Sequence, residues 1–318
     1  MTRKVAVLMT VKAKIDKADL SLLSKVTDTS FDDNVFNIRK NGKLLVRNIT
    51  ENVSIVSKED NSGIDIYVKE NTKNALIMIP VIVTESGLND KVYNDFHIGA
   101  NSKVNIIAGC AIHNEDSKKT GHEGIHRFFI EENADVNYIE KHYGEGHGKG
   151  HKTLDPITEI QMKPFSKMHI DTVQIEGVDS STRITKAFLE DNATLTISEK
   201  IMTSLNQFAK TDFEINLDGE NSSSHVTSRS VATGNSKQTF ISKVNGNNKS
   251  FCHVECDGIL KENGTVEANP QISANHLEAN LIHEATIGKI AGDQLLKLMS
   301  LGLSSDEAEK EIINGFLK

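Results

Sequence analysis

Tryptophan is absent from this 318-residue chain, aromatic residues make up only 5% of it, and it has only three cysteines. The shortage of aromatic rings weakens the hypothesis of a sugar-binding protein, since such proteins stack rings against their ligands. Cys110, Cys252 and Cys256 are too few for a disulfide framework, so we expect the reducing cytoplasm as the compartment. The net charge of -8 disfavours nucleic acid as a partner.

Several functional segments and motifs are also missing. The apolar run Val5–Val11 is too short to span a membrane, and no signal-peptide cleavage site follows it. The chain has no G-x-x-x-x-G-K-[ST] motif, no G-x-S-x-G motif and no H-E-x-x-H motif. We therefore expect a chain that contacts no membrane, binds no nucleotide itself and carries no familiar hydrolase centre.

A weak repeat runs through residues 30 to 275. Each copy is a turn, usually with Asn, followed by alternating apolar residues, as in Asn101-Ser-Lys-Val-Asn-Ile-Ile. Copies begin at Asn101, Asn133, Phe165 and Asn192, with looser ones at Asn221, Asn248 and Asn263. Their starts are 32, 32, 27, 29, 27 and 15 residues apart. Spacing near 30 with strand patterns predicts a mainly β protein built as a β-solenoid; a β-sandwich is the alternative.

The element pattern divides the chain into three parts. Residues 1–90 form an N-terminal helical and strand segment, with a helix expected over Lys12–Val26; residues 91–280 form the solenoid; residues 281–318 form a helical tail. In the tail, a helix is expected over Ile287–Leu301, ended by Gly302. Ser304 or Ser305 then caps a second helix that ends near Phe316. The two helices either pack on their own domain or dock a partner.

Possible metal ligands are densest between residues 97 and 151. This stretch holds Cys110 and seven histidines: His97, His113, His122, His126, His142, His147 and His151. Cys110-x-x-His113 resembles half of a metal site, although Cys110 is equally consistent with a buried core thiol. His142, His147 and His151 are also consistent with a flexible glycine-rich loop.

Two further groups lie nearer the C-terminus. In Cys252-His253-x-x-Cys256, a strand places both cysteines on one face and His253 on the other. His283 and Glu284 stand at the junction between the strand-rich body and the tail. A packed cysteine pair and a structural histidine are the alternatives to metal ligands at these two places.

The tail HEATIGKI, LGLS and INGF, with GCAIHN and NADVNYIEKHYGEG upstream, resembles the SufB/SufD family of iron–sulfur cluster assembly proteins. The resemblance covers roughly residues 95 to 318. It implies a right-handed parallel β-helix with helical segments at both ends, and a homodimer formed through the β-helix cores. It also implies that the tail binds a SufC-like ABC ATPase.

The resemblance carries site residues over only in part. The family's histidine and following glutamate match His283 and Glu284, and a Cys-Asp pair fits Cys256-Asp257. The cysteine of scaffold-type members falls on Ala274, and the acidic residue before the histidine becomes Ile282. We expect Cys256, His283 and Glu284 as metal ligands, with Cys110 and His113 as a second set. The expected partner-binding residues are Ile287, Ile290, Leu295, Leu298, Met299, Ile312 and Phe316.

The working hypothesis is a cytoplasmic scaffold, not an enzyme, that holds a transient iron–sulfur cluster with the help of a separate ATPase. A sulfur donor and apo-protein acceptors are the further partners it requires. A structural or iron-entry partner in the same complex is one alternative, and a carbohydrate-active β-helix enzyme is another.

Overall fold

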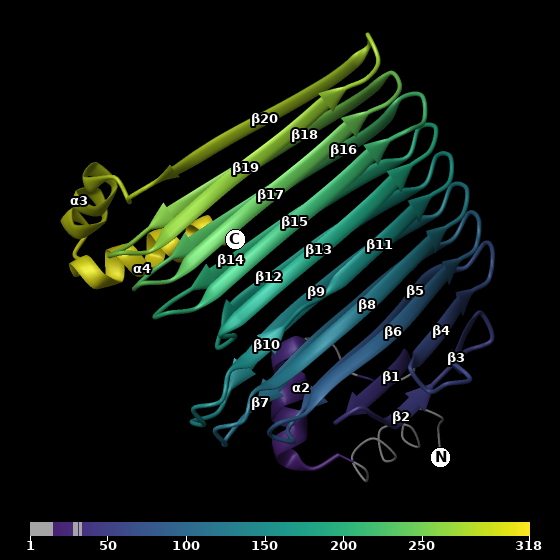
Figure 1. Ribbon diagram of the computed structural model, residues 1–318, viewed down its shortest axis with the longest axis horizontal. Coiled ribbons are helices and arrows are strands. Elements are labelled where there is room, and N and C mark those ends of the chain that lie inside the picture. Colours follow the sequence, from purple (N-terminus) through teal and green to yellow (C-terminus); the bar gives the residue numbers. More distant parts are fainter. Residues whose placement is uncertain (1–14, 28–30, 32–33) are drawn as a thin grey trace.

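Two sheets facing each other form most of the molecule in the computed structural model, which describes residues 15–27, 31 and 34–318. Together they form a parallel β-solenoid of about eight coils with helices at its two ends (Figure 1). The helices are α2 (Lys17–Val26), α3 (Gly292–Ser300) and α4 (Ser305–Phe316). Among the described residues, no helix has both the length and the apolar character needed to cross a bilayer.

Each full coil supplies one strand to each sheet. The first sheet, sheet A, has the order β2 (Lys43–Asn48), β1 (Val35–Lys40), β5 (Lys73–Val83), β7 (Lys103–His113), β9 (Asp135–Glu145), β12 (Lys167–Glu176), β14 (Thr194–Thr203), β16 (Ser222–Ala232), β18 (Ser250–Leu260), β20 (Ala279–Gly288). The second, sheet B, runs β19 (Thr265–Ala274), β17 (Lys237–Gly246), β15 (Phe208–Leu217), β13 (Ser180–Leu189), β10 (Lys152–Leu154) with β11 (Ile157–Met162), β8 (Thr120–Ile130), β6 (Asn89–Ile98), β4 (Gly63–Val68), β3 (Val53–Ser57). Pairing is parallel except at β1–β2 and β3–β4, where the first coil closes as two antiparallel pairs.

The corners of the coils explain the repeat in the sequence. Five of its starting residues have left-handed backbone angles between 56° and 60°: Asn101, Asn133, Phe165, Asn192 and Asn221. Asparagine tolerates this conformation, so it marks one corner of successive coils. The predicted solenoid is confirmed. Asn263 belongs to the opposite corner of the coil, because it leads into a strand of sheet B; its neighbour Glu262 has φ of 58° there. The interval of 15 residues between Asn248 and Asn263 is therefore half a coil.

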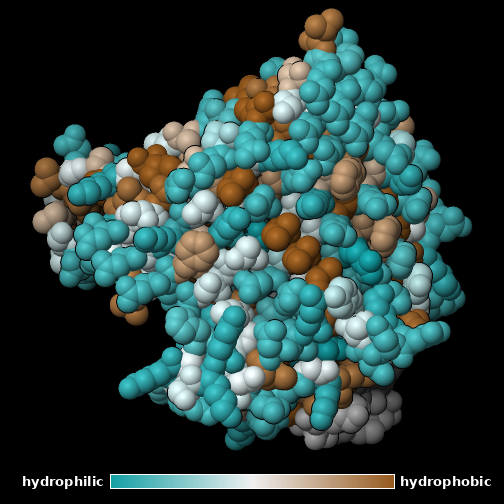
Figure 2. All heavy atoms as spheres, viewed as in Figure 1, coloured by the Kyte–Doolittle hydropathy of each residue, from teal (hydrophilic) through white to brown (hydrophobic). Residues whose placement is uncertain are grey.

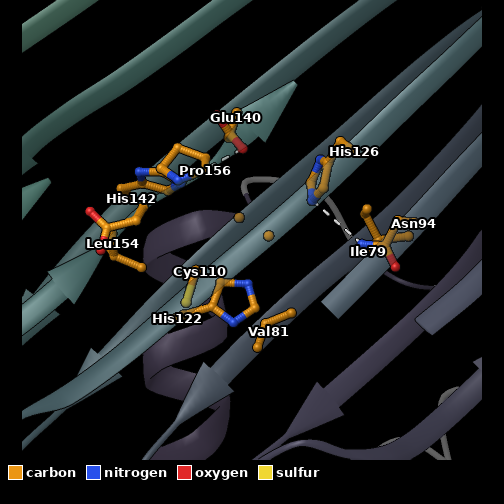
Figure 3. Close-up of a pocket in the computed structure, with 13 residues that line it drawn as sticks. Ile79, Val81, Asn94, Cys110, His122, His126, Glu140, His142, Leu154 and Pro156 are labelled. Carbon is orange, nitrogen blue, oxygen red and sulfur yellow. Dashed lines mark hydrogen bonds and ion pairs between the residues drawn. The ribbon is translucent and has the colours of Figure 1, made fainter. Parts of the chain in front are cut away.

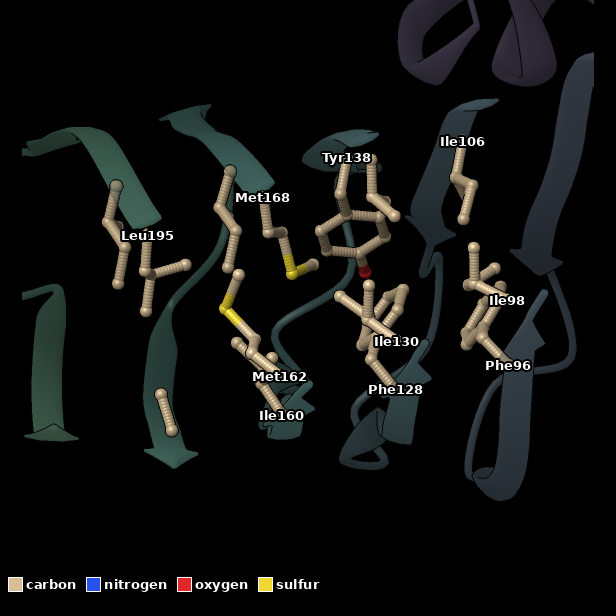
Figure 4. Close-up of a cluster of buried hydrophobic side chains, with 14 of the residues drawn as sticks. Phe96, Ile98, Ile106, Phe128, Ile130, Tyr138, Ile160, Met162, Met168 and Leu195 are labelled. Atoms are coloured by element: carbon tan, nitrogen blue, oxygen red, sulfur yellow. The ribbon is translucent and has the colours of Figure 1, made fainter. Parts of the chain in front are cut away.

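The space between the sheets is filled mainly by apolar side chains that alternate with outward-facing polar ones along each strand. Phe96 of β6 and Phe128 of β8 stack at 4.4 Å between ring centroids, and Tyr138 of β9 meets Phe128 edge-on (Figure 4). Ile, Leu and Met continue this core along the coils. The solenoid interior is thus a packed core, in which polar side chains stand out.

Helix α2 covers the outer face of the first strands of sheet A. Asp16 caps it by accepting a hydrogen bond from the Asp19 amide at 2.8 Å. Val26 packs so closely on Gly109 of β7 that a Cβ there would lie 2.7 Å from the Val26 Cβ. Of the helix predicted over Lys12–Val26, the structure places the part from Lys17 onwards, while residues 12–14 lie outside the described residues.

The C-terminal end of the solenoid differs from the prediction in one respect. Residues 279–288 form β20, paired along its length with β18, so the first tail helix begins at Gly292 and not at Ile287. Pairing with a neighbouring strand overrides the helical spacing of the apolar residues there. The rest of the tail agrees: Gly302 has φ of +100°, and Ser304 with Glu307 forms a capping box for α4.

Candidate functional site

Cys110, His122, His126 and His142, all from the histidine-rich stretch, meet inside the solenoid. They line a small cavity together with Glu140 (Figure 3). Its volume of about 20 Å³ is close to the space that one water molecule needs. The histidines and Cys110 come together because side chains at inward positions of neighbouring coils stack on one another. Cys110, for example, lies directly beside His142 in the ladder of β7 and β9.

A chain of hydrogen bonds starts at one wall of the cavity. Tyr138 donates to Glu140 at 3.1 Å, so His126 Nδ1 donates to the Tyr138 hydroxyl at 2.6 Å. His126 Nε2 then accepts from Asn94 at 3.4 Å. Burial lowers the pKa of His126 to about 4, and the neutral imidazole is the form that makes both bonds.

Charged groups continue this chain into the core. Glu140 pairs with Arg183 of β13, and Arg183 Nε lies 3.6 Å from Glu199 of β14. Burial opposes ionisation of Glu140, but Arg183 and His142 hold its pKa well below the usual range. Burial raises the pKa of Glu199, which accepts hydrogen bonds from Thr211 at 2.8 Å and Ser228 at 2.9 Å. A carboxylate, a guanidinium and a second carboxyl thus share one buried network.

Arg183, Glu140 and Glu199 were not among the site residues predicted from the sequence. Their positions in the sequence could have revealed them. Each is a charged residue at a place where the alternation of the strand calls for an inward-facing side chain. Glu140, Thr172, Glu199, Ser228 and Cys256 are successive partners across sheet A. A polar column therefore leads from the cavity to Cys256, four strands away.

The predicted pair Cys110 and His113 is separated by the structure. Cys110 is buried in the interior, and burial, then Asp90 and Glu140, raises the pKa of its thiol well above the usual value. His113 faces outward, where its two ring nitrogens lie 3.2 Å from Glu115 and 3.1 Å from Glu145. Residues three apart on a strand point to opposite faces, so these two cannot share an ion.

The other histidines of this stretch lie apart from the cavity. His97 is stacked between Tyr67 and Phe129 on the outer face of sheet B. His147 and His151 are exposed between β9 and β10, as expected for the glycine-rich loop, but His142 is not in that loop. It lies within β9 because that strand extends to Glu145.

The second predicted set lies at the last coil. Cys256 of β18 is fully buried; burial, then Glu199 and Asp257, raises its pKa to about 12. His283 of β20 is the partner of Val254 and shares its inward face; its buried Nε2 has no hydrogen-bond partner in the part of the chain that the structure describes. Burial, and then His253, lowers the His283 pKa. Both side chains therefore face the end of the interior, one strand apart.

Glu284 does not join Cys256 and His283. It projects from the outer face, where its Oε2 lies 3.7 Å from His253 Nε2. Ala274, onto which the family cysteine was placed, ends β19 in the other sheet. Within the described ranges, no three His, Cys, Asp or Glu side chains are arranged to hold a metal ion. Cys252 also faces inward, and burial raises its pKa to about 12.

Of the seven predicted partner-binding residues, four line one groove, Leu295 and Leu298 are half-buried on α3, and Met299 is exposed. Ile287, Ile290, Ile312 and Phe316 line a groove of about 500 Å³ between the last coil and the tail. The Phe316 carbonyl accepts a hydrogen bond from Arg229 of β16 at 3.0 Å, which ties α4 to the solenoid. In contrast, the exposed apolar side chains of the tail belong to α3 and the residue after it: Leu296, Met299 and Leu301. Figure 2 shows apolar atoms on this projecting part of the surface.

Comparison with families of known proteins matches residues 90–316 to the SufBD core domain of SUF-system FeS cluster assembly. Three curated relatives, each described as an iron-sulfur cluster assembly SufBD family protein, extend the similarity. The one from Archaeoglobus fulgidus is 27% identical over 282 residues, covering 87% of this chain and 73% of the relative. The one from Methanocaldococcus jannaschii is 27% identical and covers 74% of each chain. The one from Pyrococcus horikoshii is 25% identical and covers 86% of this chain and 84% of the relative.

Proposed function

Because this chain belongs to the SufBD family of iron–sulfur cluster assembly proteins, we propose that it is a scaffold that holds a nascent cluster and passes it on. Iron and sulfide are its substrates, and apo-proteins are the acceptors. The observation that carries the proposal is the position of Cys256 and His283. A thiol and an unpartnered imidazole nitrogen face the same interior, next to the open end of the solenoid.

The donors suit a cluster that is held only transiently. Iron–sulfur clusters bind cysteine thiolates, and imidazole replaces thiolate in some of them. The Cys256 thiol, with a pKa of about 12, is protonated at neutral pH, so cluster binding has to displace its proton. This requirement weakens the hold of the free protein on the cluster and favours release to an acceptor.

A homodimer through the last coil completes this proposal. Within the described part of the chain, β19 and β20 each pair with one strand, which leaves the backbone groups of their far edges without a strand partner. Apolar side chains are exposed at this end, among them Ile272 of β19 and Leu277 in the turn before β20. Docking of a second copy would cover these edges and bring two copies of Cys256 and His283 near one interface.

The second partner is an ABC-type ATPase that docks on the tail. The chain itself lacks a P-loop, and α3 presents the exposed side chains of Leu296 and Met299. Because α4 is tied to β16 through Arg229, force applied to the tail would reach the strands beside Cys256. ATP-driven movement of the two ATPase subunits would then open or close the cluster site.

The test is anaerobic reconstitution of the full chain with iron and sulfide, with and without its ATPase. We expect a visible charge-transfer band that Cys256→Ser removes and Cys252→Ser retains. Cys252 is the matched control because it lies on the same strand and is equally buried, with the same raised pKa of about 12.

Two results would contradict the scaffold. One is a band of full intensity in Cys256→Ser. The other is the absence of any band in a wild-type chain that still binds the ATPase; this second result favours a structural or iron-entry partner of the complex. Cleavage of polysaccharides, the remaining alternative from the sequence, has no support in the family to which the chain belongs.

A further inference from the structure

Two histidines and a glutamate lie close to one another on the outer face of the last strands of sheet A, although not at the spacing of metal ligands. His225 of β16 and His253 of β18 are direct partners in the ladder, and their ring centroids are 5.2 Å apart. Glu284 of β20 lies two residues beyond Ile282, the partner of His253, and its Oε2 is 3.7 Å from His253 Nε2. Two imidazoles and a carboxylate thus lie on three successive strands, with His253 next to both His225 and Glu284.

The contacts around these three side chains would be more favourable with a bound cation. His253 Nε2 is buried and has no hydrogen-bond partner among the described residues, which is rare for a native imidazole. Glu255 and Glu284 are direct partners in the ladder, and like charges in that position repel. Among the described residues, neither carboxylate has an ion pair with Lys or Arg. A bound cation would satisfy the nitrogen and relieve the repulsion together.

We propose that His225, His253 and Glu284 bind a ferrous ion on this outer face. Two histidines and one carboxylate, with positions left open for water, form a donor set typical of Fe²⁺. The donors have to move closer, since ligands about 2.1 Å from one ion lie about 3 Å apart. Partial exposure of His253 and Glu284 allows this movement, and the ion would replace the 3.2 Å hydrogen bond from Thr227 to His225.

The site has a defined place relative to the cluster ligands. Cys256 lies three residues from His253 on β18 and faces the opposite side of the sheet, as does His283 from Glu284 on β20. Iron bound outside would therefore be held one sheet thickness from the proposed cluster position, at the same end of the solenoid. Binding of the ion does not depend on the scaffold function; its role as an iron supply rests on that proposed function.

The test uses the full chain, free of sulfide, titrated anaerobically with Fe²⁺ against a chromogenic chelator and separately with Co²⁺. We expect one site per chain, with Co²⁺ giving only weak d–d bands and no intense thiolate charge-transfer band. His253→Ala and Glu284→Gln should each weaken binding about ten-fold or more. His169→Ala is the matched control, because His169 is an exposed histidine in the same outward column, on β12.

Wild-type affinity in both His253→Ala and Glu284→Gln would overturn the proposal, as would loss of binding in Cys256→Ser. Unchanged thermal unfolding of the variants shows that any loss is local. The scaffold function can fail separately from the metal site. If Fe²⁺ binding depends on His253 but the wild-type chain forms no cluster, the metal site is supported and the scaffold function is refuted. If a Cys256-dependent cluster forms but His253→Ala binds Fe²⁺ as well as the wild type does, the scaffold function is supported and the metal site is refuted.

Discussion

At the scale of single residues, the unusual property of this protein is the charge that it buries. Glu140, Arg183 and Glu199 are buried between the two sheets, where most of the other side chains are apolar or neutral polar, such as Thr172 and Ser228. Breaking a buried pair costs more than the pair contributes, because the remaining charge has lost its water. The effect of each substitution therefore depends on which charge it leaves alone.

The first prediction concerns Arg183. Arg183→Met should lower the free energy of unfolding by about 3–5 kcal/mol, since Glu140 would be left buried without its cation. Chemical denaturation measures the loss. Lys186→Met on the same strand is the control, because Lys186 is exposed and 4.0 Å from Glu214, and it should cost less than about 1 kcal/mol. Equal effects of the two substitutions would show that the buried pair is not ionised.

The second prediction concerns pH. The pKa of His126 is about 4 in the folded protein and ordinarily 6.5, so as the pH falls the unfolded chain takes up the proton first. Stability should therefore fall between pH 6.5 and 4, by at most about 3 kcal/mol from this residue. His126→Gln, which keeps a polar group beside Tyr138, should flatten the curve. His169→Gln, at an exposed position, should leave it unchanged; an identical slope in all three proteins would refute the assignment.

At the scale of elements, strand pairing and local helical preference compete at the start of the tail. Ile287 has helical spacing to Ile290 but lies in β20, because that strand completes the ladder on β18. The helices begin only where no further pairing is available. A truncation meant to remove the tail alone should accordingly start at Gly292, leaving β20 intact.

The third prediction tests α3 as the docking surface. Leu296→Glu should abolish co-purification with the ATPase and leave the thermal unfolding temperature unchanged, because Leu296 is 64% exposed and makes few contacts to lose. Leu205→Glu is the matched control: Leu205 is 73% exposed but lies in a solenoid corner. Retained binding in Leu296→Glu, or equal loss in both variants, would place the dock elsewhere.

At the scale of the whole molecule, the two ends of the solenoid are capped differently. The first coil closes with two antiparallel pairs, β1–β2 and β3–β4, and α2 covers the neighbouring face of sheet A. Among the residues that the structure describes, nothing covers the last coil in this way, so inward positions of β19 and β20 are exposed or half-buried. Unpaired strand edges of this kind are templates for pairing with another chain, which is the basis of the homodimer proposed above.

The fourth prediction follows from that difference. Ile272 continues the inward column of the buried Val244, yet it is 43% exposed because β19 is the last strand of sheet B among the described residues. Ile272→Lys should convert a dimer to a monomer, measured by light scattering after size exclusion, since a charge would be trapped in the interface. Phe188→Lys, on the outer face of sheet B and 45% exposed, should remain dimeric. A dimer in both variants would mean that the copies associate through another surface.

The sequence by itself determined the solenoid, its corners and the helices of the tail, since these depend on short-range rules. Asparagine accepts the left-handed corner at Asn101 and Asn133, and alternation keeps one face of each strand apolar. Cys256 and His283 could also be predicted as metal ligands from the sequence, because the residues around them resemble the motifs of the SufB/SufD family.

Only the tertiary structure decided which side chains meet, because contacts between coils join residues 27 to 32 positions apart. Register placed Cys110 beside His142 and not His113, and the packing of sheet B on sheet A brought Arg183 to both Glu140 and Glu199. The same register turned Glu284 away from Cys256 and toward His253. A shift of one residue would reverse every such choice, since neighbouring residues on a strand face opposite sides.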